Sequence, residues 1–324
     1  MRIAVAGSTT WGVTLAWLLA REGRDVAIIA RDEADAAGIE ARRGLSRLPE
    51  LRLPPEVTAC LPNAPGDIDA LVVAVPAQDL RAFVEPLPLP RNIPVLSGAK
   101  GIEHGTSLRV SQVLQELGFA RISVLSGPTL AREVVRGLPA AAVIASEREG
   151  RAAMWQELLA TPVFRTYRSD DVVGVELCGA YKNVVAIAAG ASAALRLGDN
   201  TLASIVTRGL AEMTRLGVAM GAQPATFGGL AGVGDLAATC FSPLSRNHQL
   251  GELLAQGRKP AEAIAEIGEA VEGAATAPMV VGMAHQLGVE VPIAEQVAAV
   301  IAGQATVWEA MDALLRRSLK PESV

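Results

Sequence analysis

Short, unbroken apolar runs alternate with amphipathic segments along the first half of the chain. A strand covered on both faces gives such a run, whereas a helix gives apolar positions three or four residues apart, as Leu15, Leu18 and Leu19 do within 11–22. Strands that alternate with helices form a parallel, doubly wound sheet. Strands are therefore predicted at residues 3–6, 26–30, 70–75, 95–97, 122–126 and 141–145, with an irregular segment at 42–55.

The pattern changes after about residue 168, where Ala, Leu, Glu and Gly recur with helical periodicity and almost no strand signal. One long apolar helix is predicted over 172–195, and Gly221, Gly251, Gly257 and Gly288 stand where helices should end. A chain of this length exceeds one ordinary core. We therefore expect an α/β domain over residues 1–171 and an all-α domain over 172–324, with further helices at 202–220, 260–269, 274–287 and 293–302.

Composition and charge exclude several classes of protein. Half of the 324 residues are hydrophobic and 19% are charged, which is typical of a globular protein. The net charge of -5 argues against a nucleic-acid partner. Cys60, Cys178 and Cys240 are far apart, as expected of small buried side chains in a reducing compartment. The chain enters a strand directly, and its longest apolar stretches, at 184–195 and 297–307, fall short of the roughly 18 residues of a membrane helix. We expect a cytoplasmic protein with no membrane insertion.

A glycine-bounded turn, Gly7-Ser8-Thr9-Thr10-Trp11-Gly12, lies between the first strand and the first helix. There a helix N-terminus offers free N–H groups to a pyrophosphate, Gly7 makes the tight turn and Gly12 allows close helix packing. Thr9 takes the place of the usual middle glycine. Its Cβ should hold a pyrophosphate farther away, although its hydroxyl could bond a phosphate oxygen. An ordinary strand–turn–helix remains the alternative, but the position predicts a Rossmann dinucleotide-binding domain.

The end of the second strand bears on the choice of cofactor. Dehydrogenases that use NAD usually place an acidic residue there to bind the ribose hydroxyls. Here Ala30 is followed by Arg31 and Asp32. The small residue and the arginine favour a 2′-phosphate and therefore NADPH, whereas Asp32 keeps NADH open. A solvated turn is the alternative interpretation of this pair.

Lys182 is the most informative residue, because it lies in the middle of the most apolar predicted helix. A lysine is almost never fully buried without a partner, although its stem can also snorkel toward solvent. Its place where the two predicted domains meet favours a functional role, since a lysine with a lowered pKa can exchange a proton near neutrality. With Lys100, Arg246 and several hydroxyls, it would suit a phosphorylated carbonyl substrate. Plain turns remain the simpler interpretation of Ser97-Gly98 and Gly127-Pro128 taken separately.

Several short motifs occur in one order between about residues 2 and 320. They are Trp11-Gly12, Ala74-Val75-Pro76, Lys100-Gly101-Ile102, Leu125-Ser126-Gly127-Pro128, Gly179-x-x-Lys182-Asn183, Thr207-Arg208-Gly209-Leu210-Ala211-Glu212, Gly232-x-Gly234-Asp235-Leu236, Ser242-Pro243-Leu244-Ser245-Arg246-Asn247 and Val271-Glu272-Gly273. The ordered set resembles the bacterial NAD(P)-dependent glycerol-3-phosphate dehydrogenases. The resemblance implies reduction of dihydroxyacetone phosphate to sn-glycerol 3-phosphate for phospholipid synthesis. NADPH is the expected cofactor with NADH left open, and a homodimer is one arrangement that the sequence allows.

The resemblance also implies a role for individual residues. Lys182 would exchange the proton at the reacting oxygen, and no metal would be needed, because His104, His248 and His285 form no ligand cluster with the cysteines. The substrate would contact Lys100, Gly127, Thr129, Lys182, Asp235, Ser245, Arg246 and Asn247. The cofactor would contact Gly7, Thr9, Thr10, Trp11, Gly12, Arg31, Lys100, Ala131, Arg246, Ala270 and Glu272.

The chain departs from the family pattern at three positions. Besides Thr9, the segment Arg47-Leu48-Pro49 lacks the aromatic residue that usually precedes Leu-Pro, so contacts near the adenine should differ. Thr129 stands where serine is usual and keeps the hydroxyl. Two other functions stay open: a ketopantoate reductase or 3-hydroxy acid dehydrogenase, and a non-catalytic NADPH sensor. The Lys100-Gly101 pair and the Ser245-Arg246-Asn247 run argue against the first, and Lys182 argues against the second.

Overall fold

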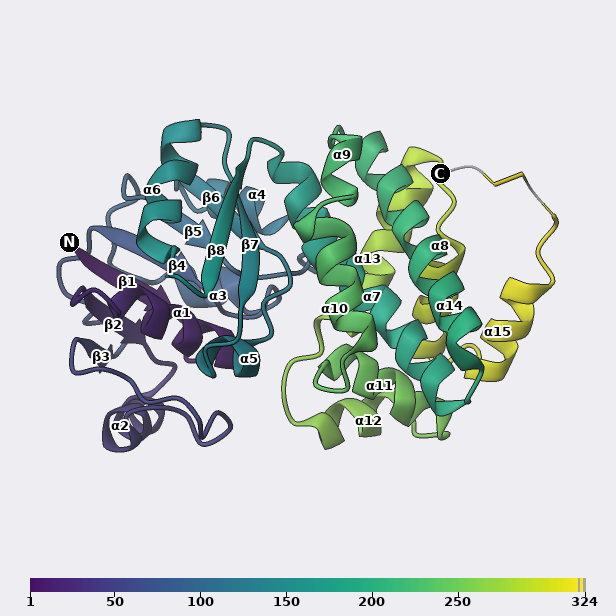
Figure 1. The fold of residues 1–324 in the computed structure, drawn as a ribbon, viewed down its shortest axis with the longest axis horizontal. Helices are drawn as coiled ribbons and strands as arrows, with labels where there is room; N and C mark the ends of the chain where they lie inside the picture. The colour runs from purple at the N-terminus through teal and green to yellow at the C-terminus, as the bar shows by residue number, and fades with distance from the viewer. Residues whose placement is uncertain (320, 323–324) are drawn as a thin grey trace. The chain divides into compact units, whose positions relative to one another are not determined.

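The computed structural model describes residues 1–319 and 321–322, which fold as two compact units (Figure 1). Unit 1 comprises Met1–Lys100 and Arg109–Val172, and unit 2 comprises Gly101–Leu108 and Val173–Val324. The segment Gly101–Leu108 therefore belongs with the second unit although it lies early in the sequence. Its Ile102 is fully buried in a small apolar cluster with Ala180 and Met283, which explains why it leaves the first unit.

An eight-stranded sheet forms the centre of unit 1, in the order β3-β2-β1-β4-β5-β6-β7-β8. All neighbouring strands are parallel except β6 and β7, which are antiparallel. The chain order reverses between β1 and β4, and in such sheets ligands bind beyond the carboxyl ends of the strands at this switch point. The strands are β1 (Arg2–Ala6), β2 (Asp25–Ile29), β3 (Val57–Cys60), β4 (Ala70–Val73), β5 (Val95–Ser97), β6 (Ile122–Ser126), β7 (Ala140–Ala145) and β8 (Phe164–Ser169).

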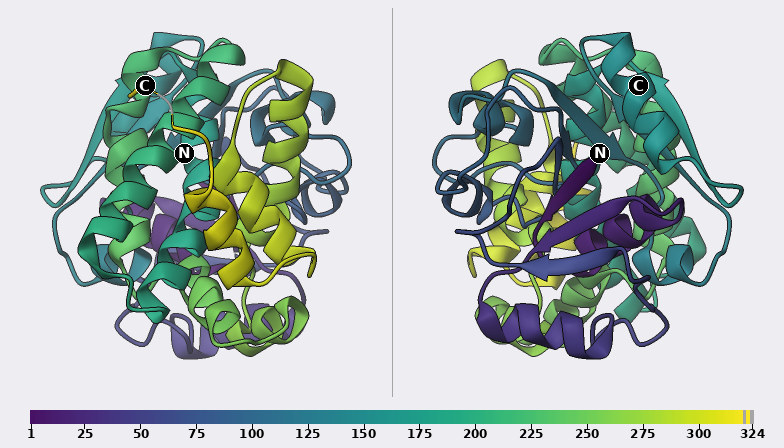
Figure 2. Two further views of the ribbon diagram at one scale, coloured as in Figure 1. Left: turned by 90° about the vertical axis from the view of Figure 1, so that its right-hand side faces the viewer. Right: turned by 90° about the vertical axis from the view of Figure 1, so that its left-hand side faces the viewer.

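Helices pack on this sheet around one apolar core. Leu15 and Leu19 of the first helix share that core with Ile3 and Ile28 of the strands and with Trp155, and all five side chains are essentially inaccessible to solvent. Figure 2 shows β1, β2 and β3 side by side in purple to blue. The helices of unit 1 are α1 (Thr10–Ala20), α2 (Glu33–Arg42), α3 (Leu80–Val84), α4 (Val110–Glu116), α5 (Ala131–Val135) and α6 (Glu149–Leu159).

The named elements in the described part of unit 2 are all helices, packed around one buried helix, α7 (Val172–Ala194). The others are α8 (Gly198–Ala219), α9 (Pro224–Phe227), the π-helical turn η1 (Leu230–Gly234), α10 (Asp235–Phe241), α11 (Arg246–Ala255), α12 (Pro260–Ile267), α13 (Glu272–Leu287), α14 (Pro292–Ile301) and α15 (Val307–Leu315). By length and composition α7 could cross a membrane, so the expectation that every apolar stretch is too short for a membrane helix was wrong. However, 78% of its most apolar window is buried within the protein, as in a core helix of a soluble protein.

The structure contains the helices and strands that the sequence predicted, with their ends shifted by a few residues. The segment predicted to be irregular contains no helix or strand between Arg42 and Val57. Two further predictions were wrong. The sequence pattern missed β3 and β8, because both lie at edges of the sheet and lack a continuous apolar run. Gly251 does not end a helix but lies inside α11, where a Cβ atom would stand 1.9 Å from the carbonyl oxygen of Ile187. That glycine lets α11 pack directly on the backbone of α7.

Candidate active site

The predicted dinucleotide turn has the required strand–turn–helix geometry. Gly7 has a φ of +107°, which other residues rarely adopt, and a Cβ there would lie 2.7 Å from a methyl group of Val75. A Cβ on Gly12 would lie 2.2 Å from the Gly7 carbonyl oxygen. Both glycines are therefore needed to bring the first turn of α1 against the strand ends, where its backbone N–H groups can meet a pyrophosphate.

Thr9 supports this turn instead of obstructing it. Its hydroxyl accepts a hydrogen bond from the Gly12 N–H at 3.0 Å, which caps the N-terminus of α1. The same hydroxyl donates to the carbonyl oxygen of Ala74 at 2.7 Å. The side chain is thus directed toward the end of β4, and its hydroxyl is engaged within the fold. The two sequence expectations for this side chain, a displaced pyrophosphate and a bond to a phosphate, stay predictions.

The ribose end contains one basic and two acidic side chains. Arg31 is largely exposed and its Nε lies 3.3 Å from Asp32. Asp32 caps α2 by accepting the Asp35 N–H at 2.8 Å, and this hydrogen bond is the main cause of its lowered pKa. Asp35, which sequence reasoning missed, accepts the hydroxyl of Ser8 and, at 3.4 Å, the Arg31 N–H. Its position three residues into a capped helix is the signal that could have revealed it.

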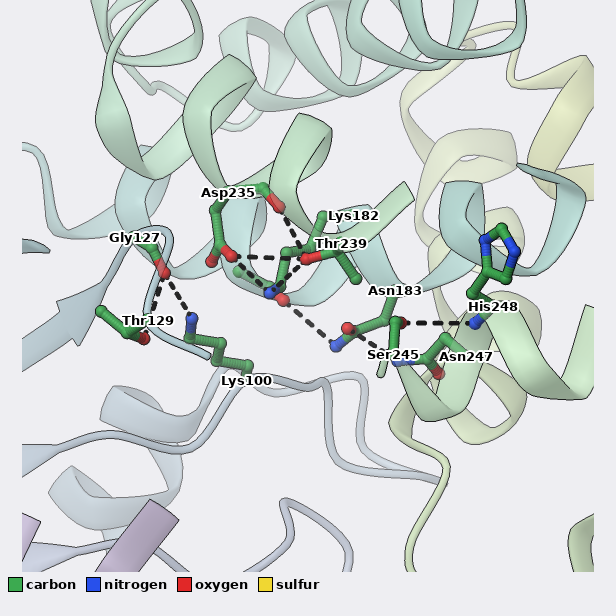
Figure 3. Close-up of polar contacts among 11 residues, drawn as sticks. Lys100, Gly127, Thr129, Lys182, Asn183, Asp235, Thr239, Ser245, Asn247 and His248 are labelled. Carbon is green, nitrogen blue, oxygen red and sulfur yellow. Dashed lines mark hydrogen bonds and ion pairs between the residues drawn. The ribbon is translucent and has the colours of Figure 1, made fainter. Parts of the chain in front are cut away.

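Lys100, Gly127 and Thr129 come together in unit 1 beyond the ends of β5 and β6 (Figure 3). The Gly127 carbonyl oxygen accepts hydrogen bonds from Lys100 Nζ at 3.0 Å and from Thr129 Oγ1 at 3.2 Å. Gly127 has a φ of +137°, and a Cβ there would lie 2.9 Å from Ala142 Cα, so glycine is required. The polar set is therefore a preformed cluster of one ammonium and one hydroxyl.

Lys182 and Asp235 form a buried ion pair within unit 2. Lys182 Nζ, on α7, lies 2.5 Å from Asp235 Oδ1 and donates to Thr239 Oγ1 at 2.8 Å (Figure 3). Thr239 in turn donates to the Asp235 carbonyl oxygen at 2.6 Å, so its oxygen is oriented to accept. All three residues are buried, which excludes the solvent-reaching alternative for the lysine. Thr239 was missed, although its spacing of four from Asp235 puts both on one face of α10.

A second polar network joins three helices of unit 2. Asn247, on α11, donates from Nδ2 to Asn183 Oδ1 at 2.9 Å and accepts the Gly273 N–H of α13 at 2.9 Å. Asn183 follows Lys182 on α7 and donates to the Gly179 carbonyl oxygen at 3.2 Å. A Cβ on Gly273 would lie 2.5 Å from the Asn183 carbonyl oxygen, so the three helices meet closely there.

The residues around this network differ in exposure. Ser245 is buried and caps α11 by accepting the His248 N–H, whereas Arg246 is exposed and lies 3.4 Å from Glu269. Glu272 opens α13 half-buried, and Ala270 precedes it in an exposed position. Ala131 opens the short helix α5 in unit 1. The N-terminus of α11 thus presents an arginine and free backbone N–H groups, which suits an anion.

Among the described residues, no group of three or more His, Cys, Asp and Glu side chains that could hold a metal ion occurs. His248 is buried with Nδ1 2.9 Å from the Cys240 carbonyl oxygen, and His285 lies 3.5 Å from Glu295. The three cysteines are free thiols, and burial raises the pKa of Cys240 to about 12. Cys178 and Cys240 are buried as expected, whereas Cys60 is only partly buried.

Comparison with known proteins decides the family. The sequence model of the NAD-dependent glycerol-3-phosphate dehydrogenase N-terminus matches residues 2–152, and the model of the C-terminus of the same family matches residues 171–312. The chain belongs to the NAD-dependent glycerol-3-phosphate dehydrogenase family. A nicotinamide cofactor follows from this membership.

Curated relatives extend over the full length. The glycerol-3-phosphate dehydrogenase [NAD(P)+] of Bradyrhizobium sp. is 45% identical over 99% of this chain and 98% of its own, and that of Corynebacterium glutamicum (strain R) is 44% identical over 99% of both chains. The crystal structure of the glycerol-3-phosphate dehydrogenase from Coxiella burnetii superposes with a TM-score of 0.89 at 34% identity, over 98% of this chain and 99% of the other. A ketopantoate reductase from Ralstonia eutropha, at 17% identity and a TM-score of 0.59, shares the fold alone.

Proposed function

We propose that this chain is a glycerol-3-phosphate dehydrogenase, which reversibly reduces dihydroxyacetone phosphate to sn-glycerol 3-phosphate for glycerophospholipid synthesis. The observation that carries the proposal is the Lys182–Asp235 pair, which is buried in the helical unit of a chain from this family. Burying an ion pair in an apolar interior costs desolvation free energy unless both groups are well hydrogen-bonded. Proton transfer at a substrate carbonyl is a function that would explain why this pair is buried.

Lys182 acts in this proposal as the acid for reduction and the base for oxidation. The nicotinamide, when bound, supplies or accepts a hydride at the substrate carbon. As charge grows on the carbonyl oxygen, the Lys182 ammonium stabilises it and gives up a proton. The Asp235 carboxylate and the Thr239 hydroxyl both accept hydrogen bonds from Nζ and thereby hold the ammonium in one position.

The phosphate of the substrate fits the N-terminus of α11. Arg246 supplies a fork of donors, and the helix end adds backbone N–H groups. We assign substrate contacts to Lys100, Gly127, Thr129, Lys182, Asp235, Ser245, Arg246 and Asn247. Residues 172–324 would form the substrate and catalytic domain, and residues 1–171 the dinucleotide domain.

For the cofactor, the preformed turn between Gly7 and Gly12 fits a pyrophosphate, because the lack of a Cβ at both glycines lets the turn and the N-terminus of α1 pack closely on the strand ends. The indole Nε1 of Trp11 is buried without a hydrogen-bond partner among the described residues, which also suits a group bound there. We assign cofactor contacts to Gly7, Thr9, Thr10, Trp11, Gly12, Arg31, Lys100, Ala131, Arg246, Ala270 and Glu272. We further propose that NADPH is preferred to NADH through Arg31, that the enzyme is cytoplasmic and that it forms a homodimer.

The test is a spectrophotometric assay of NADPH and NADH oxidation with dihydroxyacetone phosphate. Turnover with this ketone but not with ketopantoate is the expected result, and Lys182→Met provides the inactive control. Binding of NADPH without turnover of dihydroxyacetone phosphate would refute the proposed reaction and favour a sensor.

A further inference from the structure

Arg47, from the irregular segment after α2, lies on the dinucleotide turn. Its Nε donates to the hydroxyl of Thr10 at 3.0 Å, and its Nη2 donates to the Ser8 carbonyl oxygen at 2.7 Å. Both partners belong to the turn between Gly7 and Gly12. The guanidinium therefore stands beside the first turn of α1, although 37 residues separate Arg47 from Thr10.

The segment that carries Arg47 is anchored on both sides of it. Leu48 and Leu51 are buried in the core of unit 1, and the Leu48 N–H donates to the Leu45 carbonyl oxygen at 3.1 Å. The Leu53 N–H donates to the Arg43 carbonyl oxygen at 2.9 Å, which closes the segment on itself. A side chain held on an anchored segment loses little further freedom when it binds a ligand, so its placement on the turn is prepared in advance.

The charges around Ser8 make this placement informative. Asp35 accepts the Ser8 hydroxyl on one side, and Arg47 bonds the Ser8 carbonyl oxygen on the other. A carboxylate so close to a phosphate-binding turn opposes an anion, and the guanidinium offsets it. With Nε and Nη2 donated to the turn, the Arg47 guanidinium sets a positive charge beside the place of a bound phosphate.

We propose that Arg47 is a cofactor-binding residue that contacts the pyrophosphate of the nicotinamide dinucleotide. The proposal rests on the proposed dinucleotide site at the Gly7–Gly12 turn. The pyrophosphate is common to NADH and NADPH, so Arg47 strengthens the binding of both cofactors by a similar factor. In this respect it differs from Arg31, whose proposed partner is the 2′-phosphate.

Binding, not turnover, provides the test. Dissociation constants for NADH, NADPH, ADP-ribose and adenosine are measured by isothermal titration calorimetry on the full chain. Arg47→Ala should raise the constants for the first three ligands about tenfold or more, as expected for a lost charge-assisted bond, and leave adenosine unchanged. Raising the salt concentration should reduce the difference between the dissociation constants of Arg47→Ala and wild type, because salt screens the charge of Arg47.

Two further variants separate the charge from the fold. Arg47→Gln can still donate to the turn but carries no charge, so it should behave like Arg47→Ala, whereas Arg47→Lys should recover part of the affinity. Arg42→Ala removes a neighbouring exposed arginine at the end of α2 and should bind all four ligands as wild type does.

Two outcomes would overturn the proposal. If the dissociation constants in Arg47→Gln are unchanged, Arg47 only holds its own segment against the turn. If only the affinity for NADPH falls, Arg47 contacts the 2′-phosphate and not the pyrophosphate. A wild-type chain that binds NADPH well but fails to reduce dihydroxyacetone phosphate would refute the reaction and leave the Arg47 proposal standing.

Discussion

Lys182 Nζ and Asp235 Oδ1 lie 2.5 Å apart in the interior of the helical unit, on α7 and α10 respectively. The two residues are 53 positions apart in the chain, and both are buried. Each charge depends on the other, because an isolated charge in an apolar interior is strongly disfavoured. The pair therefore serves the fold and the proposed chemistry together, and the two roles can be separated by mutation.

Replacing Lys182 should abolish turnover without removing the cofactor. Lys182→Ala is expected to lower kcat at least about a hundredfold, since the acid at the reacting oxygen is lost. The dissociation constant for NADPH should stay near the wild-type value. A variant that keeps most of its kcat would remove Lys182 from the mechanism.

The Lys182–Asp235 ion pair should also affect the free energy of unfolding. Lys182→Met removes the ammonium beside the buried Asp235 carboxylate, so it should cost about 3–5 kcal/mol in the free energy of unfolding. Lys182→Met combined with Asp235→Leu should cost less than the two single changes added together, because no buried charge is left unpaired. Urea denaturation of the four proteins measures the coupling. Additive losses would show that the two groups do not depend on each other.

Arg246 should act on substrate affinity. Arg246→Ala removes charge-assisted hydrogen bonds worth roughly 1.5–3 kcal/mol, so KM for dihydroxyacetone phosphate should rise by about one to two powers of ten. Arg258→Ala, an exposed arginine that pairs with Glu266 just beyond α11, is the matched control. A KM within about twofold of wild type would show that Arg246 is misassigned.

Cofactor choice should depend on Arg31. The wild-type enzyme is expected to use NADPH more efficiently than NADH by on the order of tenfold, and Arg31→Ala should narrow that gap mainly through KM. Asp32 and Asp35 oppose this preference, since their carboxylates lie beside the Arg31 side chain and backbone. The measurement is kcat/KM for both cofactors in wild type and variant. A preference for NADH that Arg31→Ala leaves unchanged would assign the choice to the acidic residues.

Glu212 should make stability depend on pH. Burial raises the pKa of Glu212 to about 7 from an ordinary value of 4.5, against the hydrogen bonds from Tyr181 and from the backbone N–H groups of Ile293 and Ala294. A raised carboxyl pKa means that the folded state holds a proton that the unfolded state releases. Stability is therefore lost as pH rises from about 4.5 to about 7, by up to roughly 3 kcal/mol.

Urea denaturation across that pH range provides the measurement for Glu212. The Glu212→Gln side chain cannot ionise, so the free energy of unfolding of this variant should depend less on pH. Glu295→Gln, a nearby change on α14, should keep the pH dependence of the wild type. An equal slope in wild type and Glu212→Gln would contradict the assignment to Glu212.

The sequence predicted the α/β and all-α character of the two halves, because continuous apolar runs and helical periodicity are local consequences of burial on two faces or on one. It also located the turn between Gly7 and Gly12, since only glycine tolerates the φ of +107° and the close contacts found there. The sequence pattern did not predict the edge strands β3 and β8, because a half-exposed strand has no continuous apolar run.

Other features depended on residues that are far apart in the chain. Nothing local in the sequence shows that Thr9 turns its hydroxyl toward Ala74, that Arg47 lies on the turn that begins at Gly7, or that Gly251 lies against the backbone of Ile187. Lys182 was recognised as unusual because a lysine in an apolar helix needs a partner, but its pairing with Asp235 and Thr239 required α10 to pack on α7. Periodicity and backbone preference act within a few residues and can be read from the sequence. Which side chains meet is set by the packing of whole helices and strands, and only the tertiary structure decided it.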